Sequence, residues 1–390
     1  LRRQRQMCIR DRGYPLMAAD RRAEAIVVGA GIIGAACAWR LAQQGLQVLL
    51  VDNQRAGATA AGMGHLVCMD DNPAELALSA YSLQLWRSLV ERLPENCAWR
   101  GCGTLWLAER DDEMAIAEAK CQRMAEYGVA SEIQSAAQVA GLEPMLRPGL
   151  AGGLRVPGDG IVYAPNVARW LVNDAGSAIR VITGEACALE ERAIVLASGE
   201  RLTAPAVVLA CGLQANRLLE QPILRAKKGQ LAITDRYPHR IHHQLVELGY
   251  GASAHASDGT SVAFNVQARP TGQLLIGSSR QYDAPGNDID FPLLAAMLAR
   301  ANAFLPTLAQ MNVIRCWTGQ RAASADGLPL LGPHPQHRWL WLALGHEGLG
   351  VTTALGSAEL ISAQIHHHRP AIDDTPYLAA RMFSTEVLAI

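Results

Sequence analysis

The chain has 390 residues, of which 50% are hydrophobic and 18% are charged, and its formal net charge is −1. This length allows two domains or one large interleaved unit, and this composition is typical of a compact α/β protein and excludes a disordered chain. Because acidic and basic residues are nearly balanced, the chain has no overall basic field, which excludes nucleic acid as a partner.

The cysteines are scattered along the chain, odd in number and without a C-x-x-C pair. They are Cys8, Cys37, Cys68, Cys97, Cys102, Cys121, Cys187, Cys211 and Cys316. This pattern predicts buried or incidental thiols in a reducing compartment, and it signals no zinc or iron–sulfur site. The sequence has no apolar run long enough to span a membrane. We therefore expect a cytoplasmic protein, with peripheral attachment to the inner membrane face as the alternative.

The two ends of the chain carry unusual segments. Residues 1–22 are basic and lack the apolar core of a secretory signal, so we expect Met17 to be the true initiator and these residues to lie outside the fold. Three consecutive histidines, residues 366–368, form too short a run to predict a metal site. We expect them to be a solvated helix end.

A glycine motif follows the first strong apolar segment of the chain. Ala25–Val28 is predicted to be a buried strand, and Gly29, Gly31 and Gly34 have the G-x-G-x-x-G spacing. In such a motif the first glycine permits a tight turn and the second lets the backbone approach a pyrophosphate. The third allows the helix to pack closely on the strand. The helix N-terminus then faces negative charge.

The residues after the glycines extend this motif into a β-α-β unit. A helix is predicted from about Ile32 to Gln44, ending at Gly45, and a second strand ends at Asp52. An acid at the end of that strand can hold ribose hydroxyls. These features predict dinucleotide binding; the alternative is a glycine-rich turn in an ordinary α/β domain.

The spacing of the later segments distinguishes between two dinucleotides. An NAD domain would continue promptly into a third strand, but residues 56–65 are a loop of small residues. The next comparable strand-to-glycine pattern is at 204–219, after strands and helices that look like a different sheet. A nucleotide domain interrupted by long insertions favours FAD over NAD.

Four blocks of the sequence resemble the FAD-dependent amino acid oxidase family, which includes D-amino acid, glycine and sarcosine oxidases. The blocks are the glycine motif with Asp52, "VVLACG", "RPTGQLLIGSS", and "WTGQRAASADGLPLLGP" followed by "GHEGLGVTTALGSAELI". The resemblance runs from about Ala23 to Pro376. Within the family, "AAGMGHLVCMDD" and "GHEGLGVTT" are most similar to bacterial D-hydroxyproline (D-proline) dehydrogenases.

The resemblance implies an α/β fold with two interleaved domains. One is a Rossmann-like FAD-binding domain of the p-hydroxybenzoate-hydroxylase/glutathione-reductase type, made of residues 23–95, 148–222 and 318–376. The other is a mixed α+β substrate domain, made of residues 96–147 and 223–317. The residue patterns agree with this division: "CGTLWLAE" is predicted to be a strand, and "DEMAIAEAKCQRMAEYG" a helix that ends at Gly128.

The resemblance also implies which residues hold FAD. They are Gly29, Gly31, Ile32, Ile33, Gly34, Asp52, Ala61, Gly62, Met63, Gly212, Gly345, Gly348, Leu349, Gly350 and Val351. Residues 345–350 form a loop that opens into a helix, so backbone amides and the positive helix end would face the flavin pyrimidine ring. The alternative is an ordinary helix start. We expect non-covalent FAD; attachment through Cys316 is the alternative.

Four residues are candidates for substrate binding and catalysis. Arg321 stands where the family places an arginine that binds the substrate carboxylate, and the alternative is a surface or salt-bridged arginine. Period-two alternation in the strand that contains Asn265 places Phe264, Val266 and Ala268 on one face. Asn265, Gln267 and Arg269 lie on the other face.

Asn265 is close to where several oxidases have a tyrosine, so its amide is a candidate to bond a substrate hydroxyl or ring nitrogen. His65 and His346 are candidate proton acceptors, because a histidine can titrate near neutral pH; the alternative is a structural role. No role follows for Glu347.

The resemblance therefore implies FAD-dependent dehydrogenation of a D-amino or imino acid by hydride transfer to flavin N5, without a metal. The best candidates are cis-4-hydroxy-D-proline and D-proline. One alternative is a glycine- or sarcosine-type oxidase that produces hydrogen peroxide. Another is an FAD-carrying subunit of a hetero-oligomer that is inactive alone. The electron acceptor, whether quinone, electron-transfer partner or oxygen, and the homo- or hetero-oligomeric state stay open.

Overall fold

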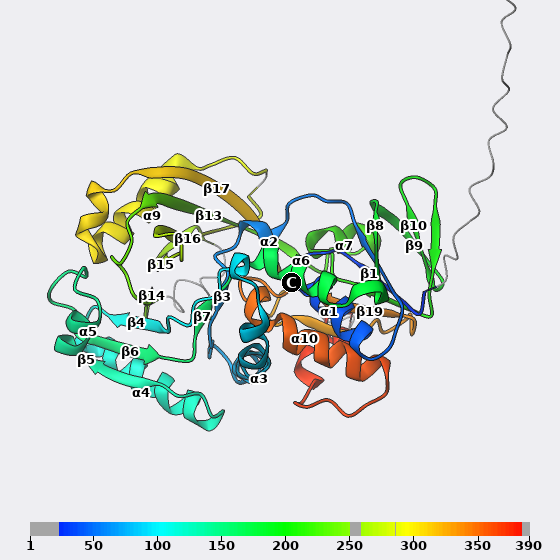
Figure 1. The fold of residues 1–390 in the computed structure, drawn as a ribbon, viewed down its shortest axis with the longest axis horizontal. Coiled ribbons are helices and arrows are strands. Elements are labelled where there is room, and N and C mark those ends of the chain that lie inside the picture. Colours follow the sequence, from blue (N-terminus) through cyan, green and yellow to red (C-terminus); the bar gives the residue numbers. More distant parts are fainter. Residues whose placement is uncertain (1–22, 250–258, 285, 384–390) are drawn as a thin grey trace, which may run out of the picture.

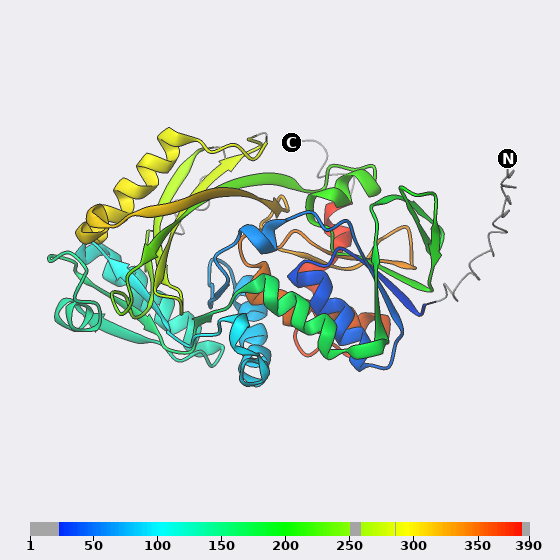
Figure 2. The same cartoon turned by 45° about the horizontal axis from the view of Figure 1, so that its top comes forward.

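The computed structural model describes residues 23–249, 259–284 and 286–383. The expectations for residues 1–22 and for Met17 lie outside these ranges. Two sheets, one of six and one of eight strands, dominate the described chain and lie side by side (Figures 1 and 2). The residues that the two sheets present where they meet are candidates for a functional site.

The six-stranded sheet has the order β18-β19-β12-β1-β2-β8. Its neighbours pair in parallel except β18 and β19, which are antiparallel. The bounds are β1 Ala25–Val28, β2 Val48–Asp52, β8 Ile179–Thr183, β12 Ala206–Leu209, β18 Leu330–Pro333 and β19 Leu340–Leu344. The predicted strand Ala25–Val28 and the strand ending at Asp52 are thus confirmed. Their continuous apolar sequence reflects burial on both faces, as expected for a parallel sheet.

Each face of this sheet packs against a different layer. Alternate residues such as Val27 and Leu50 pack on a layer of helices, which lies below the sheet in Figure 2. These helices are α1 Ile32–Gln43, α3 Pro73–Leu89, α6 Ala164–Asp174 and α10 Gly350–Ile365. The intervening residues, such as Ile26 and Leu49, pack toward a three-stranded antiparallel sheet and a short helix. These elements are β9 Ala186–Glu190, β10 Ala193–Leu196, β11 Arg201–Thr203 and α7 Ala215–Leu218.

Helix α1 begins and ends close to its predicted bounds. Gly31 is its N-cap, and the helix ends at Gln43, two residues before Gly45. Gly45 has φ +92°, a left-handed conformation that favours glycine and ends the helix.

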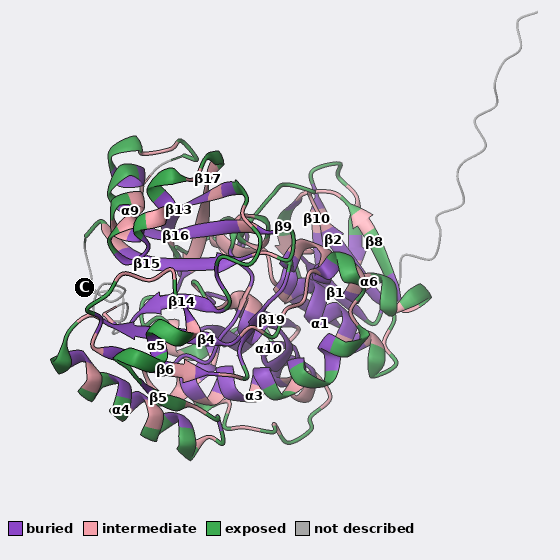
Figure 3. Cartoon of the chain, turned by 60° about the vertical axis from the view of Figure 1, so that its left-hand side comes forward, coloured by how far each residue is buried: buried purple, intermediate pink, exposed green. Residues whose placement is uncertain are grey.

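The eight-stranded sheet has the order β17-β13-β16-β15-β14-β4-β6-β5. The bounds are β4 Thr104–Ala108, β5 Glu132–Ser135, β6 Gly152–Val156, β13 Arg225–Arg236, β14 Gln244–Glu247, β15 Ser261–Ala268, β16 Gln273–Tyr282 and β17 Val313–Ala323. Its helices are α4 Asp111–Glu126, α5 Ala136–Leu142 and α9 Phe291–Phe304. The predicted strand around Leu105 and the helix before Gly128 are confirmed. Figure 3 shows the strands largely buried and α4 largely exposed on its outer side.

The two faces of β15 differ as the alternation predicted. Phe264 and Val266 are fully buried in a core that includes residues of α9. Asn265 and Gln267 point to the opposite face, where their amides bond to residues 63–65. That polar face is turned toward the six-stranded part of the molecule.

Two expected domain boundaries, at residues 148 and 318, fall inside the eight-stranded sheet. Strand β6 pairs with β4 and β5, and β17 pairs with β13 from Val313 through Ala323. Boundaries at 148 and 318 would therefore separate paired strands. The ladder partners are distant in sequence, so local patterns did not reveal them. We propose that the division be moved to the loops after Val156 and after Ala323.

The loop predicted at 56–65 contains a single helical turn, α2 Ala58–Ala61. Before the strand-to-glycine pattern at 204–219, β10 and β11 form a hairpin, and β12 joins the six-stranded sheet. A small ladder, β3 His65–Leu66 with β7 Gly160–Ile161, lies between the large sheets. Short 3₁₀ turns complete the structure at Val90–Arg92, Glu95–Cys97, Gly176–Ala178, Gly212–Gln214, Pro306–Gln310, Thr375–Tyr377 and Ala379–Met382.

The three histidines directly follow α10, which ends at Ile365, as expected. Within the described ranges, no helix combines the length and the apolar character needed to cross a membrane.

Candidate active site

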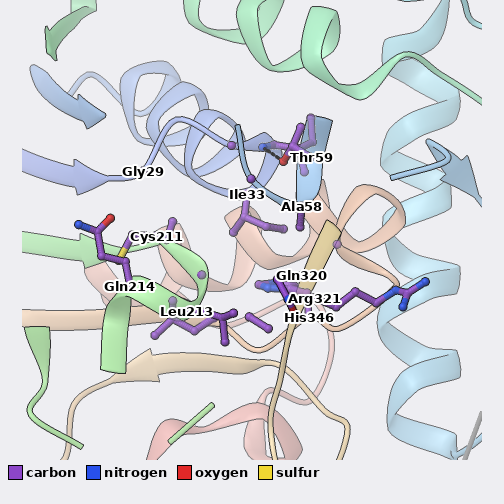
Figure 4. A pocket seen from close by; sticks show the side chains of 18 of the residues that line it. Gly29, Ile33, Ala58, Thr59, Cys211, Leu213, Gln214, Gln320, Arg321 and His346 are labelled. Carbon is purple, nitrogen blue, oxygen red and sulfur yellow. Dashed lines mark hydrogen bonds between the residues drawn. The ribbon is translucent and has the colours of Figure 1, made fainter. Parts of the chain in front are cut away.

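A cavity of about 400 Å³ runs from the carboxyl ends of the parallel strands to β17 (Figure 4). Val28, Asp52, Ala210 and Leu344, at or next to the ends of four neighbouring strands, line one part of it. Arg321 lines the other part. In open α/β sheets, ligands bind at the carboxyl ends of the strands, and this cavity has that position.

The turn after β1 needs its glycines for steric reasons. Gly29 has φ +101°, and a Cβ there would lie 2.7 Å from the Ala210 carbonyl oxygen. A Cβ on Gly34 would lie 1.8 Å from the Gly29 oxygen, so Gly34 lies beneath the turn and lets α1 pack against it. A Cβ on Gly31 would approach the Thr59 hydroxyl to 3.0 Å. The expected steric reasons for Gly29 and Gly34 thus hold in this chain, whereas the space beside Gly31 is taken by the Thr59 side chain.

The first turn of α1 presents backbone amides and apolar side chains to the cavity. Gly31, Ile32 and Ile33 line it, and the Ile32 amide donates to the Thr59 hydroxyl at 3.0 Å. Asp52 accepts hydrogen bonds from the amides of Ala30 at 2.7 Å and Gln54 at 2.6 Å. Asp52 therefore fixes the turn while its carboxylate lines the cavity. A positive helix end beside a strand-end acid fits a dinucleotide with a pyrophosphate and a ribose.

The loop after α2 is tied to the eight-stranded sheet. The Ala61 oxygen accepts from Trp317 Nε1 at 3.1 Å, and the Met63 oxygen accepts from Gln267 Nε2 at 2.6 Å. A Cβ on Gly319 would lie 2.3 Å from the Ala61 side chain, so β17 has a glycine where α2 contacts it. Gly62 and Met63 line the cavity, whereas Ala61 anchors the loop behind it.

The loop before α10 forms another wall of the cavity. Gly345, His346, Gly348, Gly350 and Val351 line it. Of the other predicted cofactor residues, Gly212 lines the same cavity. Leu349 is the N-cap of α10 and lines a smaller adjacent cavity.

Arg321 lies at the end of the cavity remote from Gly29, and its side chain extends farther in that direction (Figure 4). Its Nη1 donates to the Ser279 oxygen at 3.3 Å. A Cβ on Gly229 would lie 2.5 Å from Nη1, so the guanidinium occupies the space above that glycine. The structure therefore brings a permanent cation to one end of the nucleotide cavity.

Glu347 and Lys227 lie beside Arg321. Lys227 is the register partner of Arg321, and its Nζ is 3.1 Å from Glu347 Oε1. Burial by itself would raise the pKa of Glu347, but the positive charges of Arg321, Lys227 and Arg280 lower the pKa to about 2. Glu347 is thus a carboxylate throughout the neutral range. Neither Lys227 nor Arg280 was predicted from the sequence, although strand alternation around "RAKKGQ" was an available signal for Lys227.

His65 lines the cavity but already has hydrogen bonds at both ring nitrogens. Its Nδ1 bonds to Gln244 Oε1, and its Nε2 is 3.1 Å from Asn265 Nδ2. The Gln244 amide is oriented by donation to the Thr104 hydroxyl and the Gly160 oxygen. Its Oε1 therefore accepts, which places the proton of His65 on Nδ1. Burial lowers the pKa of His65 to about 4. The expectation of a proton acceptor titrating near neutral pH is wrong for this residue.

The same correction applies to His346. It is buried, its Nε2 is 3.0 Å from the Ser357 hydroxyl, and burial lowers its pKa to about 3. Both histidines are neutral at neutral pH because the protein interior disfavours the charged ring. Asn265 is 5% exposed and its Nδ2 contacts His65, while its buried Oδ1 has no hydrogen-bond partner within the described residues.

Cys316 lies on the wrong face of β17 for covalent attachment of a flavin. It packs against the core beneath α9, whereas the adjacent Trp317 packs with Met63, Leu231 and Leu275 on the cavity side. Successive side chains of a strand point to opposite faces. This position does not support attachment of the flavin through Cys316.

The fold and this site define a dinucleotide-binding protein with a cationic pocket at the far end of the nucleotide cavity. The family described as FAD dependent oxidoreductase (DAO) matches residues 24–364, and the chain belongs to that family. FAD is its cofactor, and the protein is an FAD-dependent oxidoreductase.

Individual relatives match over nearly the whole chain. Hydrogen cyanide synthase subunit HcnC from Pseudomonas aeruginosa is 25% identical, over 95% of this chain and 99% of its own. Glycine oxidase from Geobacillus kaustophilus is 26% identical in sequence, over 92% of this chain and 97% of its own. A crystal structure of glycine oxidase from Geobacillus kaustophilus has a TM-score of 0.81 at 24% identity, covering 92% of this chain and 99% of its own. L-proline dehydrogenase from P. horikoshii has a TM-score of 0.84 at 17% identity, covering 93% and 98%. At these identities the structures demonstrate a shared fold.

Proposed function

We propose that this protein dehydrogenates an amino or imino acid, with D-proline or cis-4-hydroxy-D-proline as the best candidate, to the cyclic imine. The observation that carries this proposal is the position of Arg321 at the far end of the nucleotide cavity. A guanidinium presents a planar pair of donors that matches a carboxylate, so it would fix the carboxylate end of the substrate.

An apolar cluster near the cavity supports a substrate with a hydrocarbon ring. Met63, Leu231 and Leu275 pack together with Ile233 and Trp317, on the same face of the sheet as Arg321. Of these residues Met63 lines the cavity, and its apolar side chain favours the methylene groups of a pyrrolidine over the bare α-carbon of glycine. The sequence similarity to D-hydroxyproline dehydrogenases in "AAGMGHLVCMDD" and "GHEGLGVTT" supports the same choice.

In this proposal Gly29, Gly31 and the first turn of α1 would hold the pyrophosphate, and Asp52 would hold a ribose. The start of α10 would face the flavin pyrimidine ring. FAD, when bound, supplies the acceptor for the hydride from the substrate α-carbon. Arg321 and the apolar cluster hold the substrate in one orientation, which supplies proximity and excludes water. His65 and Asn265 are positioning residues, because their hydrogen bonds join the loop of Met63 to β14 and β15.

Two alternatives remain, each with its own support. Similarity to a glycine oxidase supports an oxidase that acts on glycine or sarcosine and forms hydrogen peroxide. Similarity to a protein named as a subunit supports an FAD-carrying chain that needs partners. A reducing compartment, the cytoplasm, is part of our proposal, because all cysteines within the described ranges are free thiols.

One assay distinguishes the three possibilities. The purified, FAD-loaded chain is mixed separately with D-proline, cis-4-hydroxy-D-proline, sarcosine and glycine. Reduction of an artificial dye with the prolines supports our proposal, whereas hydrogen peroxide from glycine or sarcosine supports the oxidase. Absence of flavin reduction with all four compounds supports the subunit that requires a partner and contradicts our proposal for the isolated chain.

A further inference from the structure

Glu347 lies within a group of cationic side chains at the substrate end of the cavity. Its Oε1 is 3.1 Å from Lys227 Nζ, and Arg321 and Arg280 lie close enough to stabilise its charge. The Lys227 side chain is 6% exposed and that of Glu347 is 22% exposed. Arg280 is 4% exposed. In a region so shielded from water, these charges interact strongly.

The backbone holds Glu347 in this position. The residue has φ +49°, its amide donates to the Ala322 oxygen at 3.1 Å, and Glu347 Oε2 accepts from the Gly348 amide at 2.6 Å. The left-handed conformation is costly for a residue with a side chain, so it persists only where surrounding contacts impose it. Ala322 is the neighbour of Arg321 on β17. The carboxylate and the guanidinium are therefore fixed relative to each other.

This arrangement places a permanent carboxylate beside the arginine that is proposed to bind the substrate carboxylate. Glu347 and a bound anion compete for the same cations. Because these cations already stabilise the charge of Glu347, they bind any further anion less strongly. A substrate with one carboxylate and one ammonium matches the pair, with its carboxylate toward Arg321 and its ammonium toward Glu347. A second carboxylate on the substrate nitrogen would instead be repelled by Glu347.

We propose that Glu347 is a specificity-determining residue that selects net-neutral zwitterionic amino or imino acids and rejects N-carboxyalkyl amino acids with a second carboxylate. This inference rests on the proposed function, because it assumes an amino acid site at Arg321. It adds a selection by charge that Arg321 alone cannot supply, since a guanidinium attracts every carboxylate.

A matched pair of ligands tests the proposal. Sarcosine is N-methylglycine and iminodiacetate is N-carboxymethylglycine, so the two differ by one carboxylate. Their dissociation constants are measured anaerobically by calorimetry with the protein loaded with reduced FAD, which cannot accept a hydride. We expect the native protein to bind sarcosine more tightly, and Glu347→Gln to shift the ratio of the two constants toward iminodiacetate by about tenfold.

Glu359→Gln is the matched control, because Glu359 is on α10 and its carboxylate pairs with Arg40 outside the cavity. This variant is expected to keep the native ratio. An unchanged ratio in Glu347→Gln, or a native protein that prefers iminodiacetate, would overturn the proposal.

A second variant covers the case in which Glu347→Gln does not fold. Lys227→Gln removes the cation paired with Glu347 and leaves the carboxylate, so it is expected to increase the preference for sarcosine; an unchanged or reduced preference contradicts the proposal. Because binding is measured without turnover, the outcome is independent of catalysis. Selective binding without flavin reduction would contradict the proposed function and support this inference, whereas turnover without charge selection would do the reverse.

Discussion

The two ends of the cavity are built in different ways. The nucleotide end consists of backbone: Gly29, Gly31 and the first turn of α1 come from one continuous segment, and Asp52 follows on the next strand. The substrate end consists of side chains from separate elements, with Lys227 on β13, Arg321 on β17 and Glu347 in the loop before α10. In our proposal the first binds a charged group common to many ligands, and the second binds one class of substrate.

This difference determines how each end responds to mutation. At the nucleotide end a substitution acts through steric exclusion, because main-chain atoms fill the space that a new side chain would need. At the substrate end a substitution removes or reverses a charge without disturbing the strands. Damage to the first end should therefore abolish folding and cofactor binding together, and damage to the second should alter substrate binding alone.

The largest effect is expected at the nucleotide end. Gly34→Val would place side-chain atoms against the Gly29 oxygen, which already lies 1.8 Å from the position of a Cβ. We expect the free energy of unfolding to fall by at least about 3 kcal/mol, with loss of FAD, as measured by denaturant unfolding and flavin absorbance. Gly141→Val in α5 is the control, because a Cβ on Gly141 meets no atom within 4 Å. Retention of FAD and stability by Gly34→Val would contradict the steric account.

The next effect is expected at the substrate end. Arg321→Ala should raise KM for a carboxylate substrate roughly a hundredfold or more, because it removes a charge-assisted pair in a shielded site. FAD content and thermal stability should stay close to native. Arg217→Ala, at an exposed arginine on α7, is the control. If kinetics are unchanged in Arg321→Ala, the arginine has no part in substrate binding.

A smaller effect concerns His65, whose hydrogen bonds join the loop of Met63 to β14 and β15. The folded protein lowers the pKa of His65 from 6.5 to about 4, so between these values the unfolded chain binds a proton that the native protein does not. The contribution of neutral His65 to native stability is therefore fully present above pH 6.5, and it is lost as the pH falls toward 4.

Replacement of His65 by Gln should make the free energy of unfolding depend less steeply on pH. Part of the decline should remain, because burial also lowers the pKa of His346. Thermal unfolding between pH 4 and about 8 measures it. His367→Gln, at an exposed histidine after α10, is the control for the substitution itself. A slope that is the same with and without His65 would show that its pKa is not lowered.

The smallest effect is expected for Cys316→Ser. Because Cys316 faces the core beneath α9, away from the cavity, the variant should retain native FAD content and kinetics. Acid precipitation should release the flavin from both proteins. Flavin that stays with the native polypeptide but not with the variant would contradict the position of this thiol.

Local sequence predicted the nucleotide end well. The strand Ala25–Val28, helix α1 and the strand ending at Asp52 are continuous in the chain, so apolar periodicity and glycine spacing were enough to locate them. Alternation also predicted that Asn265 and Gln267 share a face opposite to Phe264.

Prediction failed where distant segments meet. Attachment of the flavin through Cys316 stayed open as an alternative in the sequence, and strand pairing places Cys316 and Trp317 on opposite faces of the sheet. His65 and His346 were expected to titrate near neutral pH, since their burial and partners are invisible in the sequence. Gln244, which fixes the proton of His65, is 179 residues from it along the chain.

The amino-acid sequence by itself determined the β-α-β unit, its glycine turn and the acid that ends the second strand. These depend on backbone conformation and on neighbours within a few tens of residues. Only the tertiary structure decided the protonation of the histidines, the face on which Cys316 lies, and the grouping of Lys227, Arg280 and Arg321 around Glu347. Burial and Coulomb interactions act between atoms close in space, and that closeness is set by the pairing of strands far apart in the chain.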